Sequence, residues 1–225
     1  METNTISSRQ RNHDEMKSRI LEIAMRQIAE SGAAGLSMSS IAREMGVTQP
    51  ALFRYVENRD ALITDLVIAA YEDFVSAMTM PEGLTATEIG LEQGRTLRSW
   101  ALANPHHYQL IFGTPIPGYR APKDKTNDFD EQLQQVLMAP LMGVDNAKSG
   151  VGNDDRLDSW AESAGLGQGS GWKVMHAMIG WTRLHGILSL ELAGHFTENL
   201  PDAEVIYEAE LAALTANLES HLGKP

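Results

Sequence analysis

Apolar residues recur at a helical period along most of this chain, and no segment shows the strict alternation of a half-buried strand. In the first periodic segment, Ile20, Ile23 and Ile28 fall on one side of a helix. Glycine, proline and short polar runs separate the segments, which cover residues 14–31, 38–45, 49–55, 59–80, 85–103, 106–112, 128–141, 172–195 and 201–221. The pattern predicts an all-α protein.

Residues 36–62 predict two short helices joined by a tight turn. Ser37 is a favourable N-cap for the first of them. Gly46 stands where that helix must stop in a left-handed conformation, which glycine adopts without steric cost. Thr48 can cap the second helix, and Pro50 falls in its first turn, where a missing N–H costs little. This arrangement is typical of a helix-turn-helix that presents its second helix to the major groove of DNA.

The second helix of this motif carries an unusual outward face. Leu52 and Val56 point inward, and the residues left outside are Gln49, Pro50, Ala51, Phe53 and Arg54. A glutamine suits adenine and an arginine suits guanine in the major groove. The face therefore predicts a base-reading edge, and the alternative is a helical hairpin that only forms part of a core.

The charge of the chain at first argues against a DNA-binding protein, because its formal net charge is −12. Residues 1–60 hold 8 Lys and Arg against 8 Asp and Glu, whereas residues 61–225 hold 10 against 22. Phosphate neutralisation is local, so an acidic second region does not forbid DNA binding. Arg9, Arg11, Lys17 and Arg19 add positive charge close to the first helix.

Composition excludes several other classes of protein. Cysteine is absent, which excludes disulfide frameworks and cysteine-ligated metal sites. The polar N-terminal residues lack the apolar core of a secretory signal, and no run is long enough to span a bilayer. The sequence therefore predicts a cytoplasmic protein without a membrane partner.

The expected domain organisation follows from these patterns. Residues 1–13 are expected to be a flexible polar arm, residues 14–60 the helix-turn-helix DNA-binding domain, and residues 61–225 the remainder of the protein. Residues 143–171 are rich in Gly, Ser, Asn and Asp and are expected to be a flexible linker. Helices 172–195 and 201–221 are apolar over much of their surface, which predicts a homodimer through a four-helix bundle. The alternative is that both helices are buried in a large monomer.

The chain resembles the TetR family of bacterial regulators. Residues 46–56, with the sequence GVTQPALFRYV, are similar to the turn and recognition helix of the family, and residues 58–62 are similar to the start of its fourth helix. The resemblance implies about nine helices, three of them in the DNA-binding domain, and a second domain that binds an effector and dimerises. It places Gln49, Pro50, Ala51 and Arg54 in the groove, and it places Ser37, Thr48, Phe53, Tyr55 and Arg59 at phosphate-contacting positions. Phe53 stands where the family usually has a tyrosine, and Tyr55 where it often has a histidine.

The C-terminal half resembles one TetR subgroup more weakly. Residues 181–186, with the sequence WTRLHG, are similar to the Trp–His–Gly signature of that subgroup. Residues 104–115 are similar to another of its segments. These similarities place the second domain in a lineage and do not name its ligand.

A small-molecule site in an all-α domain is usually an apolar cavity between helices. The candidate lining residues are Phe74, Met78, Trp100, Tyr108, Phe112, Leu133, Met175, Met178 and Trp181, with His107 and His185 as polar groups that could orient a ligand. For each of them the alternative is plain core packing.

Metal and catalytic chemistry are not expected. His106, His107, His176, His185 and His195 offer no pair at the spacing of one helical turn, so no metal site is predicted. No nucleophile elbow, phosphate-binding loop, dinucleotide fingerprint or His-Glu-x-x-His motif is present, and no cofactor or enzyme activity is predicted. Asp154, Asp155 and Asp158 lie within the expected linker and are interpreted as a solvated loop.

These observations favour a dimeric, ligand-responsive repressor that binds a near-palindromic operator in double-stranded DNA and is released by a small-molecule effector. Two alternatives stay open. One is an all-α small-molecule-binding protein whose helix-turn-helix is vestigial, and the other is a transcriptional activator with the same DNA-binding surface.

Overall fold

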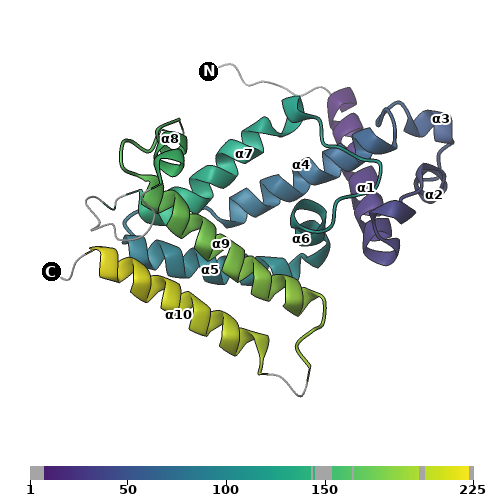
Figure 1. The fold of residues 1–225 in the computed structure, drawn as a ribbon. Coiled ribbons are helices and arrows are strands. Elements are labelled where there is room, and N and C mark those ends of the chain that lie inside the picture. Colours follow the sequence, from purple (N-terminus) through teal and green to yellow (C-terminus); the bar gives the residue numbers. More distant parts are fainter. Residues whose placement is uncertain (1–7, 143, 145–153, 164, 198–200, 223–225) are drawn as a thin grey trace. The chain divides into compact units, whose positions relative to one another are not determined.

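The computed structural model describes residues 8–142, 144, 154–163, 165–197 and 201–222, and in this part of the chain helices joined by loops form the structure, without a strand (Figure 1). Its elements are α1 (Ser8–Ser31), η1 (Ala33–Gly35), α2 (Met38–Glu44), α3 (Gln49–Leu52), α4 (Arg59–Ala77), α5 (Ala86–Ala103), α6 (Pro105–Phe112), α7 (Lys123–Met138), η2 (Ala139–Leu141), α8 (Asp155–Ser163), α9 (Gly171–Leu192) and α10 (Ala203–Leu222). The predicted all-α fold class is confirmed.

Short-range caps explain where several of these helices begin. The Ser37 hydroxyl accepts a hydrogen bond from the Ser40 backbone N–H at 3.3 Å. The Asn58 side chain accepts one from the Ala61 N–H at 2.8 Å. Such caps satisfy backbone donors that the first turn of a helix leaves without an intrahelical partner. α5 has a full capping box, in which Thr85 and Glu88 bond reciprocally, and these bonds hold the pKa of Glu88 below its usual value.

The chain divides into two compact units, and neither is continuous in sequence. Unit 1 contains the residues up to 73 together with 106–127, and unit 2 contains residues 74–105 and those from 128 onward. The boundary expected after residue 60 therefore does not coincide with the division between the units. Most of α4 belongs to unit 1, because its apolar face, including Leu62 and Leu66, completes the core of that unit.

Residues 106–127 join unit 1 through one buried polar contact and several apolar ones. Leu110, Ile111 and Ile116 pack against the unit 1 core. The hydroxyl of Thr64, which is 2% exposed, lies 3.0 Å from the hydroxyl of Tyr119 and donates to the Asp60 carbonyl at 2.9 Å. The loop after α6 is thereby fixed on α4.

In unit 2, α9 packs against α5, α8 and α10, and α5 packs against α10. α9 and α10 lie side by side in Figure 1, with α5 next to them. α5 and α10 also meet at Gly94, whose carbonyl accepts a hydrogen bond from the buried Tyr207 hydroxyl at 2.7 Å. A Cβ at Gly94 would lie only 2.4 Å from Leu211 Cδ1, so a larger residue there would force the Leu211 side chain to shift.

The first helix begins earlier than expected. α1 starts at Ser8, so residues 8–13 of the predicted flexible arm are helical. Gln10 and Asp14, one turn apart, bond at 2.9 Å and support this first part of the helix. The rest of the predicted arm, residues 1–7, lies outside the described residues.

The recognition segment is shorter as a helix than expected. α3 ends at Leu52, whereas the sequence predicted helix as far as residue 55. After Leu52 the Arg54 and Tyr55 amides bond to carbonyls only three residues back, which tightens the chain into turns.

The predicted linker 143–171 contains a helix, α8, and this expectation was wrong for residues 155–163. Asp154 precedes the helix, and hydrogen bonds from Arg156 lower the pKa of its carboxyl group to about 2. Asp158 accepts a hydrogen bond from the Gly171 N–H at 2.7 Å, at the start of α9. These aspartates are therefore structural at a helix start, and the interpretation as a solvated loop is corrected. Residues 143, 145–153 and 164 lie outside the described residues.

No helix in the described part of the chain is both long and apolar enough to cross a membrane.

Candidate DNA-binding surface and ligand cavity

The recognition segment is anchored by one apolar side chain and leaves its polar side chains outside. Leu52 is 0% exposed in the unit 1 core, whereas Gln49, Pro50 and Arg54 are exposed. Among the described residues, the side chains of Gln49 and Arg54 make no hydrogen bond or ion pair within the chain. Their donors and acceptors are therefore available to a partner.

The two aromatic residues of the segment have different environments. Phe53 is 43% exposed at the C-cap of α3, so a ring without a hydroxyl lies at the surface. Tyr55 is half-buried, and its ring lies against that of His13 on α1, with 5.1 Å between the centroids. The start of α1 thus supports the end of the recognition segment.

The predicted phosphate-contacting residues Ser37, Thr48 and Arg59 have roles inside unit 1. Ser37 and Thr48 cap α2 and α3. Arg59 donates to the Ala33 carbonyl at 2.7 Å and lies 3.7 Å from Asp60. A guanidinium has five N–H donors, so these bonds leave others for a phosphate. Contact with DNA stays a prediction for all three.

Two basic residues near this surface are neutralised within the chain. Lys17 pairs with Asp65 at 3.0 Å, and Arg26 pairs with Glu44. Surface pairs of this kind contribute little to stability, but each reduces the local positive charge. The positive charge available to DNA in unit 1 is therefore less than the count of basic residues indicates.

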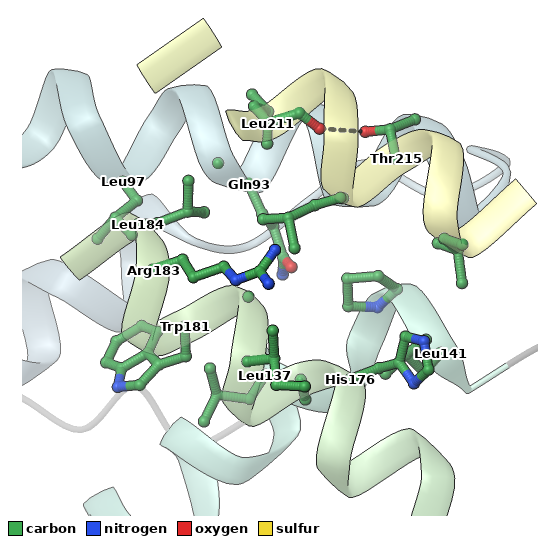
Figure 2. Close-up of a pocket in the computed structure, with 18 of the residues that line it drawn as sticks. Gln93, Leu97, Leu137, Leu141, His176, Trp181, Arg183, Leu184, Leu211 and Thr215 are labelled. Atoms are coloured by element: carbon green, nitrogen blue, oxygen red, sulfur yellow. Dashed lines mark hydrogen bonds between the residues drawn. The ribbon is translucent and has the colours of Figure 1, made fainter. Parts of the chain in front are cut away.

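Unit 2 contains a cavity of about 390 Å³ between α5, α9, α10 and the end of α7 (Figure 2). Its lining consists of Met78, Thr87, Gly90, Gln93, Gly94, Leu97, Val136, Leu137, Pro140, Leu141, His176, Ala177, Ile179, Gly180, Trp181, Arg183, Leu184, Leu211, Ala213, Leu214, Thr215, Asn217 and Leu218. Most of these side chains are apolar, and the volume falls within the range of small-molecule sites in proteins.

The polar lining residues differ in how far their bonding capacity is used. His176 Nδ1 lies 2.9 Å from the Trp172 carbonyl, and its Nε2 lies 2.9 Å from Asn217 Oδ1. Arg183 donates to Glu210 at 3.0 Å. The Gln93 amide makes no hydrogen bond to any described residue, and Gln93 and Arg183 both line the cavity (Figure 2). Gln93 and Arg183 were not among the candidates from sequence.

The structure places two of the candidate ligand-binding residues, Met78 and Trp181, in the lining of this cavity. Phe74 and Trp100 are buried aromatic neighbours, 5.1 Å apart between centroids, and Trp181 lies 6.3 Å from Phe74. The candidates of unit 2 outside the lining are Phe74, Trp100, Leu133, Met175, Met178 and His185. Met178 is 44% exposed. Phe74 and Trp100 are buried, and Leu133, Met175 and His185 are half-buried outside the cavity lining.

His185 contacts Trp181 one turn earlier on α9, with ring centroids 3.8 Å apart. Burial lowers the pKa of His185 to about 4, because the charged imidazolium loses its hydration there. The side chain is therefore neutral at pH 7.

His107, Tyr108 and Phe112 belong to unit 1 and do not line the cavity. His107 Nδ1 lies 3.3 Å from Asp73 Oδ2, and Phe112 packs edge-on against Tyr71 and Tyr108. Helical periodicity identified these residues as apolar or inward-facing but could not assign them to a compact unit. Their role in ligand binding stays a prediction.

Within the described residues, no group of three or more His, Asp or Glu side chains is placed to hold a metal ion.

Comparison with known proteins connects both units to one family. Residues 20–66 match the model for bacterial regulatory proteins of the tetR family, and residues 91–214 match the model for the tetracyclin repressor-like C-terminal domain. The HTH-type transcriptional regulator Rv1816 of Mycobacterium tuberculosis is 28% identical over 98% of this chain and 99% of its own length.

Solved structures agree with this assignment. The crystal structure of the protein SCO4313 is similar with a TM-score of 0.76 and 35% identity, over 92% of this chain and 98% of that one. A TetR variant of Acinetobacter baumannii AYE, solved in complex with minocycline, shares the fold with a TM-score of 0.50 and 16% identity, over 98% of this chain and 100% of that one. The chain therefore belongs to the tetR family of bacterial transcriptional regulators and carries the DNA-binding domain of that family.

Proposed function

We propose that this regulator is a repressor that binds a near-palindromic operator as a homodimer and is released by a small-molecule effector. The observation that carries the proposal is the recognition segment, where exposed Gln49 and Arg54 make no hydrogen bond within the described chain. Leu52 holds the same segment to the core. A buried anchor with unused donors and acceptors beside it suits direct reading of base edges.

Support for the homodimer comes from the exposed apolar side chains of the two C-terminal helices. Met178 and Leu190 on α9 and Val205 on α10 are exposed in the single chain, Val205 at 64%. A twofold dimer through these helices would use the same surface of each copy. It would also present two recognition segments about 34–36 Å apart, which is one turn of DNA.

Support for the effector comes from the position of the cavity in the chain. Met78, which lines the cavity, directly follows α4, and α4 begins at Arg59, shortly after the recognition segment. The minocycline complex of the A. baumannii TetR shows that a protein of this fold can hold a small molecule. An effector would release DNA only if it bound more tightly to the dimer geometry that does not fit the operator.

The direct test is selection from a random DNA library at low salt with the full chain. We expect enrichment of a near-palindromic sequence. Arg54→Ala should change the preferred base at one position of each half-site, whereas Arg120→Ala should not. Arg120 is a suitable control because it is an exposed arginine of unit 1 in the loop before α7.

A reporter gene placed behind the selected operator tests the direction of regulation, and we expect its expression to rise when the regulator is removed. Failure of any palindrome to be enriched would contradict operator binding and would favour a binding protein with a vestigial helix-turn-helix. A fall in reporter expression would favour an activator.

A further inference from the structure

We propose that the cavity of unit 2 takes a small amphiphilic monocarboxylic acid, with the carboxylate at Arg183 and Gln93 and the apolar body along the leucine-rich wall. The inference deepens the proposed function, since this ligand class would be the effector, and it rests on that function only for the effect on DNA.

The wall of the cavity sets the nature of the ligand body. Leu97, Leu137, Leu141, Leu184 and Leu211 surround the space from four helical segments, and Figure 2 shows them around its edge. An apolar ligand surface that leaves water for such a wall gains free energy in proportion to the area it buries. A flexible aliphatic chain or a small ring would suit 390 Å³, whereas a large polar ligand would leave its groups without partners.

The head group is set by Gln93 and Arg183. Gln93 presents an amide that bonds to no described residue. Arg183 gives one N–H of NH1 to Glu210 at 3.0 Å, and no other bond from its guanidinium to the described residues is present. The edge formed by Nε and NH2 therefore stays available, and two parallel N–H donors match the two oxygens of a carboxylate. The Gln93 amide N–H₂ can donate to the same oxygens.

The sign of the charge also favours an acid over an amine. Among the described lining residues there is an arginine and no carboxylate, although the chain as a whole has a net charge of −12. A cationic head group would lie beside the Arg183 guanidinium with no lining carboxylate to pair with it. A carboxylate would complete a three-membered arrangement in which Arg183 lies between Glu210 and the ligand.

The hydrogen bonds of other polar lining residues indicate that the ligand carries only one charged head group. His176 uses both ring nitrogens, toward the Trp172 carbonyl and the Asn217 side chain, and Thr215 donates to the Leu211 carbonyl at 2.8 Å. A second charged group on the ligand would meet side chains whose hydrogen bonds are already made. A dicarboxylic acid is therefore a poorer fit than a monocarboxylic one.

The test uses three probes with the same ten-carbon chain: decanoate, 1-decanol and decyltrimethylammonium. Binding to the full chain is measured by calorimetry and by tryptophan emission, which responds to the cavity because Trp181 lines it. We expect decanoate to bind at least about tenfold more tightly than either of the other probes, since a hydrogen bond to a charged group is roughly twice as strong as a neutral one.

Matched variants locate the head group. Arg183→Gln should lower decanoate affinity about tenfold and leave 1-decanol affinity unchanged, and Gln93→Leu should lower decanoate affinity by a smaller factor. Arg95→Gln is the control, because Arg95 also joins α5 to α10 by a carboxylate pair, with Glu208 at 3.1 Å, but does not line the cavity. Thermal unfolding without ligand verifies that each variant is folded.

Tighter binding of 1-decanol or decyltrimethylammonium than of decanoate would overturn the proposed ligand class. So would equal loss of decanoate affinity in Arg95→Gln and Arg183→Gln. If tryptophan emission changed when the protein was diluted but did not change when any of the probes was added, the cavity would be a subunit contact and the inference would be wrong.

DNA binding to the selected operator is measured separately with and without decanoate. Decanoate binding without loss of DNA affinity would support the ligand class and contradict the release function. Operator binding with no decanoate binding would support DNA recognition and overturn the proposed ligand class.

Discussion

The DNA-binding segment and the ligand cavity differ in how far apart in the sequence their parts lie. In unit 1, each cap joins residues three positions apart, as Ser37 to Ser40 and Asn58 to Ala61. In unit 2, the cavity takes its wall from residues 78–97, 136–141, 176–184 and 211–218. A surface built from one short segment can be altered residue by residue, whereas a cavity built from four segments changes shape with the packing of any of them.

The tryptophans allow the two units to be observed separately. The chain has four, and Trp100, Trp160, Trp172 and Trp181 all belong to unit 2. Tryptophan emission therefore follows unit 2, whereas far-ultraviolet circular dichroism follows the helices of both units.

The largest expected effect is that of Leu52→Ala, which removes a fully buried side chain from the unit 1 core. Large-to-small core substitutions of leucine cost about 2–5 kcal/mol, because a cavity remains. In urea we expect the dichroism transition to gain an early phase, with the tryptophan transition unchanged. A tryptophan transition that shifted equally would mean that the two units unfold together and do not differ in stability.

A second effect concerns pH and belongs to unit 2. His185 has a folded pKa of about 4, below the usual value of 6.5, so the unfolded chain binds its proton first as pH falls. The stability that the neutral form contributes is present above pH 6.5 and is lost as pH falls toward 4. By pH 4.5 the loss is about 2–3 kcal/mol.

Urea unfolding followed by tryptophan emission at pH 7 and pH 4.5 measures this loss. His185→Gln should unfold with a smaller difference between the two pH values than the unmodified chain. Because carboxylates of both units also titrate in this range, the difference between variants is the quantity to compare. An identical pH dependence in both would contradict the assignment of the effect to His185.

The next effect separates two arginines of unit 1, Arg54 at a predicted groove-facing position and Arg59 at a predicted phosphate-contacting position. Arg54→Ala should weaken the free energy of DNA binding by about 1–3 kcal/mol at one base position. It should leave the free energy of unfolding unchanged, because the Arg54 side chain makes no bond to the described chain. Arg59→Ala should weaken binding to all sequences, reduce the salt dependence, and also destabilise unit 1 by about 1 kcal/mol, because the Ala33 carbonyl loses its donor.

Competition binding against point-substituted operators at two salt concentrations, together with urea unfolding, distinguishes these outcomes. Destabilisation of the fold by Arg54→Ala would contradict the base-reading role of Arg54. A change of base preference in Arg59→Ala would contradict the phosphate-contacting role of Arg59.

The smallest effect is expected at Gly90 on α5, and Gly94 on the same helix provides a contrast. A Cβ at Gly90 would lie 3.8 Å from Pro140, in ordinary contact, so Gly90→Ala should raise stability by about 0.5–1 kcal/mol through helix propensity. A Cβ at Gly94 would lie 2.4 Å from Leu211 Cδ1, so Gly94→Ala should instead lower stability by about 1–3 kcal/mol.

Thermal melts of the two variants measure the difference, with tryptophan emission as the probe. Gly90→Ala should also weaken decanoate binding slightly, since the added methyl group enters the cavity. If Gly90→Ala lowered the stability and Gly94→Ala raised it, α10 would not pack on α5 as closely as described.

The contrast between the units also explains which features could be predicted from sequence. The helix-turn-helix was identifiable because Ser37, Gly46 and Thr48 act within a few residues, and Gly46 has the positive φ, 68°, that its position predicted. The helical fold class followed from periodicity in the same way. The role of Arg59 at the Ala33 carbonyl was not predictable, because the two residues meet only in the folded unit.

The cavity was predictable only in part. Met78 and Trp181 were recognised as apolar helix positions, but polar Gln93 and Arg183 come from helices that meet only by packing. One signal was present, since Arg183 is the single Lys, Arg, Asp or Glu between Lys173 and Glu191 in the largely apolar segment 172–195. α8 was missed because its nine residues lie between glycine-rich segments. The linker was predicted from the composition of the whole region, and the apolar pattern of Leu157, Trp160 and Ala161 is too short to indicate a helix against it.

The docking of residues 106–127 on α4 has a consequence for the order in which the protein is made. A chain emerging from the ribosome presents α1 to α4 first, then residues 74–105 of the other unit, and only afterwards Ile111, Ile116 and Tyr119. The core that supports the recognition segment is therefore completed late, after part of the ligand unit already exists. A fragment that ends at residue 73 or 105 would expose Thr64 and its apolar neighbours, so we expect a stable DNA-binding fragment to extend to about residue 127.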